Sequence, residues 1–389
     1  MISSCFAVLK SGSVQTVFCD TRRYLRQKCQ RNAAAKIAVF FMRLLSKSNI
    51  VKAGVLFLFA CTFLAGCGNN DGKHPDVSDI DADIAIRRFD KDFFALDTSS
   101  LDAGMQRLAQ EYPAMFPLFA VNIIHDQSNP DETPAQAVRG FLSSPQIRLV
   151  YDTVQQVYGD LRWLEKDLTQ MFKYYKYYFP QKPLPEVVTM VSEFATDAFT
   201  AGDSLCGIGL DMFLGENYPA YFSNPNTEPA YIHRQFRKEY ITVRLAKALA
   251  QNIADAPTGE RLLDQMLQNG KMLFIVDRLL PDVPDSLKMG YTQEQMEGCY
   301  ANEQGVWARL LEQNLLYSTD ARKLRKLVSP SPNAPVVFQE APGEIGNWIG
   351  WQIVDTYMKR FPETTLDSLL RLTDAQQFLE QAKYKPRRN

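Results

Sequence analysis

The chain has 389 residues and is nearly neutral, with 43 Lys and Arg against 44 Asp and Glu. A hydrophobic content of 46% with 12% aromatic residues excludes a wholly disordered chain. The charge balance also excludes the strongly basic composition of many nucleic-acid-binding proteins, so we expect no nucleic-acid partner.

The first recognisable element is a secretory signal. A basic stretch over residues 43–52 precedes an apolar run that ends in the segment Leu64-Ala65-Gly66-Cys67. The run is too short for a stable transmembrane helix, and the order of basic, apolar and small residues is typical of a cleaved leader. The cysteine at the cut site indicates a bacterial lipoprotein signal, in which Cys67 is acylated and becomes the first residue of the mature chain. The alternative is a buried helix that ends in a cysteine.

The leader sets the predicted boundaries. A start at Met42 gives a signal peptide of ordinary length over residues 42–66, so residues 1–41 are interpreted as an over-extended start or, alternatively, as a basic cytoplasmic arm. The polar residues 67–83 form a lipidated tether, and residues 84–389 form a single globular domain. We expect the domain to face the periplasm. The outer membrane is slightly favoured, because Gly68 rather than an aspartate follows the cysteine.

Cleavage changes the charge and the cysteine count. From Cys67 onward the chain carries 33 Lys and Arg against 43 Asp and Glu, so membrane attachment must come from the lipid rather than from a basic face. With Cys67 lipidated, Cys206 and Cys299 remain in a compartment that permits disulfides. A bridge between them and two separate buried thiols are both open.

The first half of the domain reads as mainly helical. The segment 84–89 alternates weakly and is interpreted as a first strand. Helices are expected to start at Ser99 or Ser100, Thr133-Pro134, Ser144-Pro145 and Asp160, where capping side chains or first-turn prolines occur.

The second half mixes a small sheet with further helices. Apolar runs at 187–191 and 205–214 indicate two strands. Helices are then expected from residue 227 to about 253, from 258 onward with Gly270 as an interruption, from 292 to 316, from 343 to about 361, and after 373. The prediction is an α+β fold, predominantly helical, in one domain.

One helix-like segment resembles a zinc site without its ligands. In H-E-x-x-H helices, two histidines one turn apart bind zinc and the glutamate activates water. Here His233 occupies the first position, Arg234 replaces the base and Arg237 replaces the second ligand. A guanidinium has no lone pair to offer. We therefore expect no metal, no catalytic residue at this place and a half-exposed His233 on an amphipathic helix.

Glycines at 343, 346 and 350 fall on one helical face. Each costs about 1 kcal/mol of helix propensity relative to alanine, so a compensating contact is expected. Close packing of a second helix is favoured over a ligand cradle.

An interaction loop is predicted after the second strand. Asp211, Glu216, Tyr218 and Tyr221 combine two carboxylates with two tyrosines at a strand exit, and they are the best candidates for an exposed site. The chain lacks the G-x-S-x-G, Walker-type and C-x-x-C motifs, so no cofactor is expected.

Four segments resemble the gliding-motility lipoprotein B (GldB) family of Bacteroidetes. They are Lys176-Tyr177-Tyr178-Phe179-Pro180, Leu210-Asp211-Met212-Phe213-Leu214-Gly215, Pro229-Ala230-Tyr231-Ile232 and Gly346-Asn347-Trp348-Ile349-Gly350-Trp351-Gln352-Ile353-Val354. The resemblance implies a cell-envelope lipoprotein with partners in the gliding machinery and its associated secretion system. The family is also distantly similar to predicted zinc peptidases but has lost their metal motif, which implies a degenerate zincin-like architecture. Only the acylated cysteine carries over, onto Cys67.

Two hypotheses follow. The leading one is a non-enzymatic envelope lipoprotein that acts as a scaffold or interaction subunit. The alternative is a divergent membrane-anchored, peptidase-like hydrolase that uses His233 with carboxylates such as Asp211, Glu216 or Glu344. A glycan-binding module with exposed aromatic residues is a third, weaker interpretation.

Overall fold

The computed structural model describes residues 74–125, 128–129, 131–223, 229, 231–254 and 259–387. The predicted leader, Cys67 and the first part of the tether lie outside these residues. His74–Asn389 forms one unit of the chain.

A four-stranded sheet is the centre of this unit, with the strand order β1-β2-β4-β3. The strands are β1 (Ile86–Arg87), β2 (Glu186–Met190), β3 (Ala198–Ala201) and β4 (Leu205–Gly209). The pairs β1–β2 and β2–β4 are parallel, whereas β3 and β4 form an antiparallel hairpin. The small sheet is confirmed, and the strand expected to reach Leu214 ends earlier, because Leu210–Phe213 forms a 3-10 turn.

The strand β3 was not predicted from the sequence. Its four residues are all partly buried and lack a clear apolar alternation. Gly207 in β4 has a packing reason: a Cβ on this residue would lie 2.1 Å from the ring of Phe199 in β3. The Phe199 ring therefore packs directly on the backbone of Gly207, its partner in the β3–β4 hairpin.

Helices fill the connection between β1 and β2. They are α3 (Phe89–Phe94), α4 (Leu101–Glu111), α5 (Met115–Leu118), a π-helical turn η2 (Phe119–Ile123), α6 (Pro134–Ser143), α7 (Pro145–Val157) and α8 (Arg162–Tyr178). The starts at Thr133 and Ser144 are confirmed: Thr133 forms a capping box with Gln136, and the Ser144 hydroxyl accepts a bond from the Ile147 amide. α4 follows Ser100 without a side-chain cap, and α8 begins at Arg162, two residues after Asp160.

The helix expected over 227–253 is wrong in its first half. The structure has a short α9 (Ala220–Ser223), then 3-10 turns at His233–Gln235 and Lys238–Tyr240, and only then α10 (Ile241–Ile253). The Phe236 carbonyl accepts its bond from the amide of Gly215 in another loop, and Arg237 has an extended backbone. The fully buried Phe236 side chain thus turns the chain into the core before the α-helix begins.

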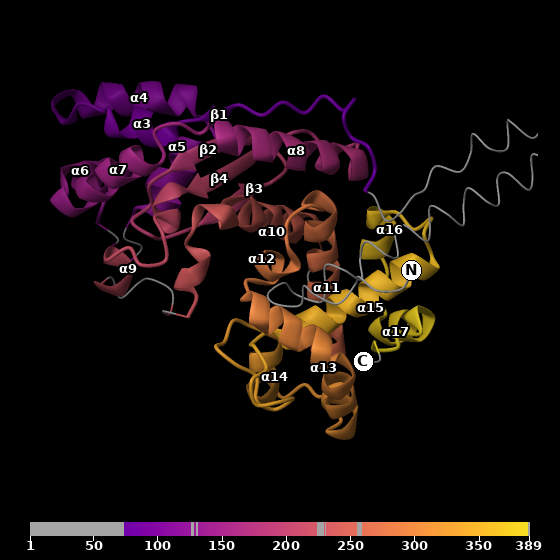
Figure 1. Ribbon diagram of the computed structural model, residues 1–389. Coiled ribbons are helices and arrows are strands. Elements are labelled where there is room, and N and C mark those ends of the chain that lie inside the picture. Colours follow the sequence, from indigo (N-terminus) through magenta and orange to yellow (C-terminus); the bar gives the residue numbers. More distant parts are fainter. Residues whose placement is uncertain are drawn as a thin grey trace, which may run out of the picture. The chain divides into compact units, whose positions relative to one another are not determined.

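The C-terminal part is helical throughout. It contains α11 (Leu262–Leu279), α12 (Asp285–Met289), α13 (Gln293–Glu312), α14 (Ala321–Val328), α15 (Ile345–Arg360), α16 (Leu366–Leu370) and α17 (Ala375–Ala382). The helix expected to reach Leu316 ends at Glu312, because Asn314 has a left-handed backbone. In Figure 1, the strands, α8 and α10 lie between α3–α7 and these C-terminal helices.

The predicted close packing is confirmed at Gly350, but Gly343 precedes α15 and is not part of its face. A Cβ on Gly343 would meet Ser331, and one on Gly346 would meet the Leu327 carbonyl of α14. A Cβ on Gly350 of α15 would lie 1.8 Å from the Met266 carbonyl oxygen of α11, and one on Gly270 of α11 would lie 2.3 Å from the Gly350 carbonyl carbon. The sequence predicted that Gly270 interrupts this helix, and that prediction is wrong: α11 continues through Gly270, which forms the other half of the contact. The two helices touch backbone to backbone.

Candidate functional site

The carboxyl end of β2 opens onto a pocket of about 520 Å³, here called the β2 pocket. Its walls come from η2, α6, α7, the loop after β2 and the segment around α9. The lining residues are Ile123, Ile124, Phe141, Gln146, Ile147, Leu149, Val150, Ser192, Glu193, Phe194, Ala195, Tyr218, Ala220 and Ser223. Most of these side chains are apolar, and the one carboxylate among them belongs to Glu193. A volume in the range of 300–1,000 Å³ is typical of ligand pockets.

The loop after β2 has an unusual backbone at the pocket wall. Glu193 and Phe194 have φ angles of 57° and 66°. Two consecutive non-glycine residues in the left-handed region are costly, at roughly 1–2 kcal/mol each. Such strain persists only where the surroundings impose it, and it is concentrated at functional sites.

The buried carboxylate of Asp211 imposes this backbone shape. Asp211 is 0% exposed, and it accepts hydrogen bonds from the Phe194 amide at 2.7 Å and from the Ser192 amide at 3.1 Å. Burial raises the pKa of Asp211 to about 6, although the bonds from the Phe194 and Ser192 amides act in the opposite direction. Asp211 thus fixes the residues on both sides of Glu193 and has no access to solvent.

The predicted interaction loop divides into buried and accessible members. Tyr221 is buried, donates its hydroxyl to the Asp211 carbonyl at 2.6 Å and accepts the Leu214 amide at 2.9 Å. Asp211 and Tyr221 therefore stabilise the loop from inside and are not exposed as expected. Glu216 and Tyr218 are partly exposed, and Tyr218 lines the β2 pocket whereas Glu216 does not.

Glu193 is the site residue that sequence reasoning missed. The residue is exposed, and partial burial of its carboxylate raises its pKa. Among the described residues, no hydrogen bond or ion pair to this carboxylate is found. The available signal was a charged residue shortly after the buried strand 187–191, at the edge of a sheet where ligands commonly bind.

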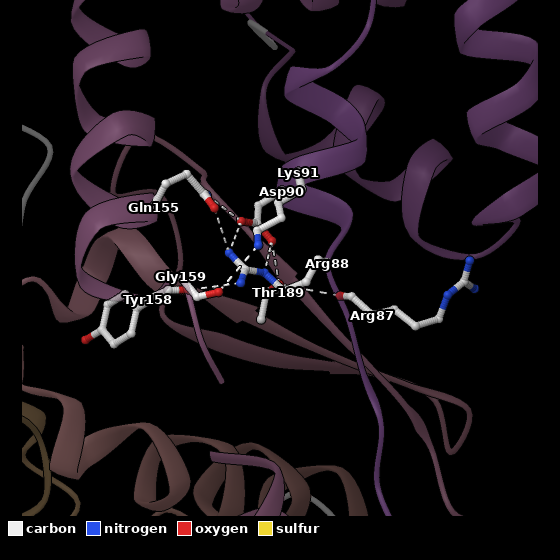
Figure 2. A network of polar contacts seen from close by, with 8 residues as sticks. All are labelled: Arg87, Arg88, Asp90, Lys91, Gln155, Tyr158, Gly159 and Thr189. Carbon is white, nitrogen blue, oxygen red and sulfur yellow. Dashed lines mark hydrogen bonds and ion pairs between the residues drawn. The ribbon is translucent and has the colours of Figure 1, made fainter. Parts of the chain in front are cut away.

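A polar network joins α3, α7 and β2 (Figure 2). The Arg88 guanidinium donates to both carboxylate oxygens of Asp90, at 2.9 and 2.7 Å, and to the Tyr158 carbonyl at 2.8 Å. Thr189 and Gln155 add bonds to the same carboxylate at 2.6 and 2.8 Å.

This network is structural rather than reactive. Asp90 is 1% exposed, and burial alone would raise its pKa, but the hydrogen bonds and positive charge of Arg88, with the bonds from Thr189 and Gln155, lower the pKa overall. Gln155 belongs to α7, the helix that supplies Leu149 and Val150 to the β2 pocket, and Thr189 belongs to β2. The Asp90 carboxylate thus joins α7, which forms one wall of the β2 pocket, to β2, whose following loop forms another wall.

The hydrolase hypothesis used His233 with carboxylates such as Glu344, and in the structure these two residues have separate structural roles. His233 is 4% exposed, in contrast to the half-exposed position expected, and its ring contacts those of Tyr221, Phe222 and Phe236 at 4.8–5.7 Å. Glu344 caps α15 with a φ of 64°. Its pKa is raised by burial, against the lowering effect of Lys247 and Arg244.

The two remaining cysteines are free thiols. Cys206 lies in β4 and Cys299 in α13, and both are buried. Burial raises the pKa of each thiol to about 12. Of the two alternatives left open by the sequence, the structure has the separate buried thiols and not the disulfide.

The described part of the chain contains neither a metal-binding cluster nor a membrane-spanning helix. Among residues 74–387, apart from the gaps stated above, no three His, Cys, Asp or Glu side chains gather in a way that could hold a metal ion. Across the same residues, every helix is too short or too polar to cross a bilayer.

Comparison with known families decides the relationship. The profile described as gliding motility protein GldB matches residues 70–386. The chain belongs to the GldB family. Neither the curated proteins nor the solved structures include a significant match. The GldB match begins three residues after Cys67 and continues through α17, so the family covers the whole described unit, including the β2 pocket.

Membership makes this chain a gliding-motility lipoprotein by family, with a cell-envelope setting. It also accounts for the four sequence segments that resembled the family, which lie in α8 and the residues that follow it, in and after the 3-10 turn at Leu210–Phe213, before the turn at His233, and in α15.

Proposed function

We propose that this chain is a non-enzymatic subunit of the gliding machinery, anchored by acylated Cys67 and bound to another envelope protein through the β2 pocket. The observation that carries the proposal is the GldB match, which starts at residue 70, directly behind the predicted lipidation site. The domain is placed on the periplasmic side, on the outer membrane in preference to the inner.

The chemistry of the β2 pocket supports binding rather than catalysis. Its one carboxylate, Glu193, lacks a neighbouring base or nucleophile among the lining residues, apart from hydroxyl groups. The nearest of these, Ser192, contacts the buried Asp211, and its hydroxyl lies 3.5 Å from that carboxylate. A nucleophilic serine requires an adjacent base and contact with its substrate. Ser192 is only 2% exposed and the Asp211 carboxylate is 0% exposed, so neither group is open to a substrate in the pocket.

The apolar rim also supports a protein partner. Large hydrophobic side chains are exposed on the elements that form the pocket: Leu149 of α7 by 66%, Phe222 of α9 by 60% and Val121 of η2 by 42%. An exposed apolar group beside a pocket is typical of an interaction surface.

The proposal includes descent of this fold from a zinc peptidase, but it assigns no peptidase activity to the chain. A small sheet with an antiparallel edge strand followed by α10 is compatible with a zincin-like origin, but no step of the proposed role depends on it.

The anchor is tested by replacing its nucleophile. Cys67→Ala is expected to abolish incorporation of an alkyne-labelled palmitate in growing cells and to move the protein out of the membrane fraction. Labelling that persists in Cys67→Ala, or an unlabelled wild-type protein in the cytosol, would contradict the proposal.

The docking surface is tested in the same cells. Affinity purification in mild detergent is expected to recover an envelope protein with wild type, and Leu149→Asp is expected to lose it, because a charge would replace an exposed apolar contact. Leu311→Asp on α13 is the matched control, since Leu311 is also exposed, by 48%, but lies away from the pocket. Equal recovery with all three proteins would contradict docking at the β2 pocket.

A further inference from the structure

We infer that the β2 pocket recognises a protein segment in which a lysine or arginine adjoins a large apolar side chain, with Glu193 as the partner of the cation. This inference rests on the proposed docking role of the same pocket and adds the chemistry of its occupant. Three observations carry it: the unpaired carboxylate, the rigid backbone that presents it, and the apolar surface around it.

The carboxylate of Glu193 needs a counter-charge. It is the one carboxylate among the lining residues, and no hydrogen bond or ion pair to it is found in the described part of the chain. Partial burial already disfavours its charged form, as the direction of its pKa shows. A partner that covers the pocket would desolvate this group further, and an unpaired covered charge is costly. A cationic side chain removes that cost, whereas an acidic or apolar residue at the same place does not.

The backbone holds Glu193 in a defined place. The amides of Ser192 and Phe194, on either side, both donate to Asp211, and the Phe194 side chain is itself buried. A group positioned in this way loses little entropy on binding, which favours selection between partner side chains. Glycine would relieve the left-handed strain at residue 193, but it would also remove the carboxylate.

The apolar surface around Glu193 favours a partner segment in which a large apolar side chain stands next to the lysine or arginine. Ile123, Ile124, Leu149 and Val150 line the pocket, and Leu149 is exposed by 66%. An aliphatic or aromatic side chain gains its binding free energy by removing this surface from water. The exposed Phe222 on α9 extends the apolar area beyond the pocket, so a polypeptide that covers the rim fits better than a compound that only fills the cavity.

The inference is tested with a phage-displayed library of 12-residue peptides against the purified, acylated full-length chain in detergent. Enriched peptides are expected to carry Lys or Arg within two positions of Leu, Ile, Met, Phe, Tyr or Trp. Their dissociation constants are then measured by fluorescence anisotropy on wild type and variants. Glu193→Gln is expected to weaken binding about tenfold and Glu193→Lys to abolish it. Glu216→Gln, which changes a carboxylate outside the pocket, is the control and should bind as wild type does.

The outcomes separate the two levels of the argument. If Leu149→Asp abolishes binding while Glu193→Gln and Glu193→Lys bind as wild type, or if enriched peptides lack cations, the role of Glu193 is wrong and docking at the pocket stands. If Leu149→Asp and both Glu193 variants leave binding unchanged, or if no peptide is enriched, both statements are overturned. Thermal melts of each variant confirm that the fold is intact, which is expected because both side chains are exposed.

Discussion

The α11–α15 crossing and the loop after β2 treat backbone geometry in opposite ways. At the crossing, Gly270 and Gly350 stand where two helices meet without room for a Cβ, so residue type and geometry agree. In the loop, Glu193 and Phe194 adopt left-handed angles that glycine would adopt without cost. The first region is built for stability. The second keeps side chains at strained positions, which is the pattern expected where those side chains have a task.

The largest effect is expected at the crossing. Gly350→Ala places a methyl group 1.8 Å from the Met266 carbonyl oxygen, so α11 and α15 must separate. We expect a loss of at least about 3 kcal/mol in the free energy of unfolding, the upper end of typical overpacking costs. Gly305→Ala in α13, where nothing lies within 4 Å of the added carbon, should be neutral or stabilising by up to about 1 kcal/mol. Urea unfolding measures the free energy of unfolding of both variants. Equal values would contradict the close backbone contact at the α11–α15 crossing.

The next largest effect is a pH dependence of the free energy of unfolding, and it comes from Asp211, which supports the loop after β2. The pKa of Asp211 is raised from an ordinary 3.8 to about 6 in the folded chain. The contribution of this group to stability is therefore fully present below pH 4 and is lost as the pH rises through 6, by about 2–3 kcal/mol.

Asp211→Asn removes that titration. The difference in unfolding free energy between wild type and Asp211→Asn should shift in favour of the variant between pH 4 and pH 7.5. Parallel urea titrations at the two pH values measure this shift. A constant difference would mean that the Asp211 carboxyl titrates alike in the folded and unfolded chains.

The smallest effect has the opposite sign. Glu193→Gly relieves the left-handed strain and should raise the free energy of unfolding by about 1 kcal/mol, while binding of cationic peptides weakens about tenfold, as for Glu193→Gln. Lys383→Gly, at a φ of 49° after α17, is a matched control that should gain similar stability without a loss of binding. A destabilised Glu193→Gly variant would show that the loop is not strained, and the comparison between the two regions would fail.

The parts of the fold that depend on local chemistry were predictable. Capping residues such as Thr133 and Thr292 predicted helix starts because each cap is satisfied within three residues of chain. The glycine face of α15 predicted a close contact but not its partner, since Gly270 lies about eighty positions away and reads as a helix break by itself.

The parts set by distant contacts were missed or misread. The segment before α10 has a helical pattern, yet the Phe236 carbonyl bonds to Gly215 and the chain leaves the helix. Asp211 and Tyr221 read as polar loop residues, but they are buried: Asp211 bonds to amides of the loop after β2, and Tyr221 bonds to backbone groups of its own loop. Glu193 gave no signal stronger than its place after a strand, since its left-handed angle is imposed by Asp211 from a different part of the chain.

The position of β1 and of the packed residues before it decides where a mechanical load would enter the protein. This strand has only two residues, lies at the edge of the sheet and follows the tether that leads back to the proposed lipid attachment. A pull on a membrane-held domain would first act on the residues before β1, where Val77 and Ala82 are buried and the Ile84 amide donates to the Thr169 hydroxyl of α8. It would then act along β1, in shear against its parallel neighbour β2. The next residue is Arg88, whose bonds to Asp90 and Tyr158 fasten the chain just behind the strand. Tension from a moving cell surface would thus pass through the bond from Arg88 to the Tyr158 carbonyl, because the ion pair with Asp90 joins residues of one short segment.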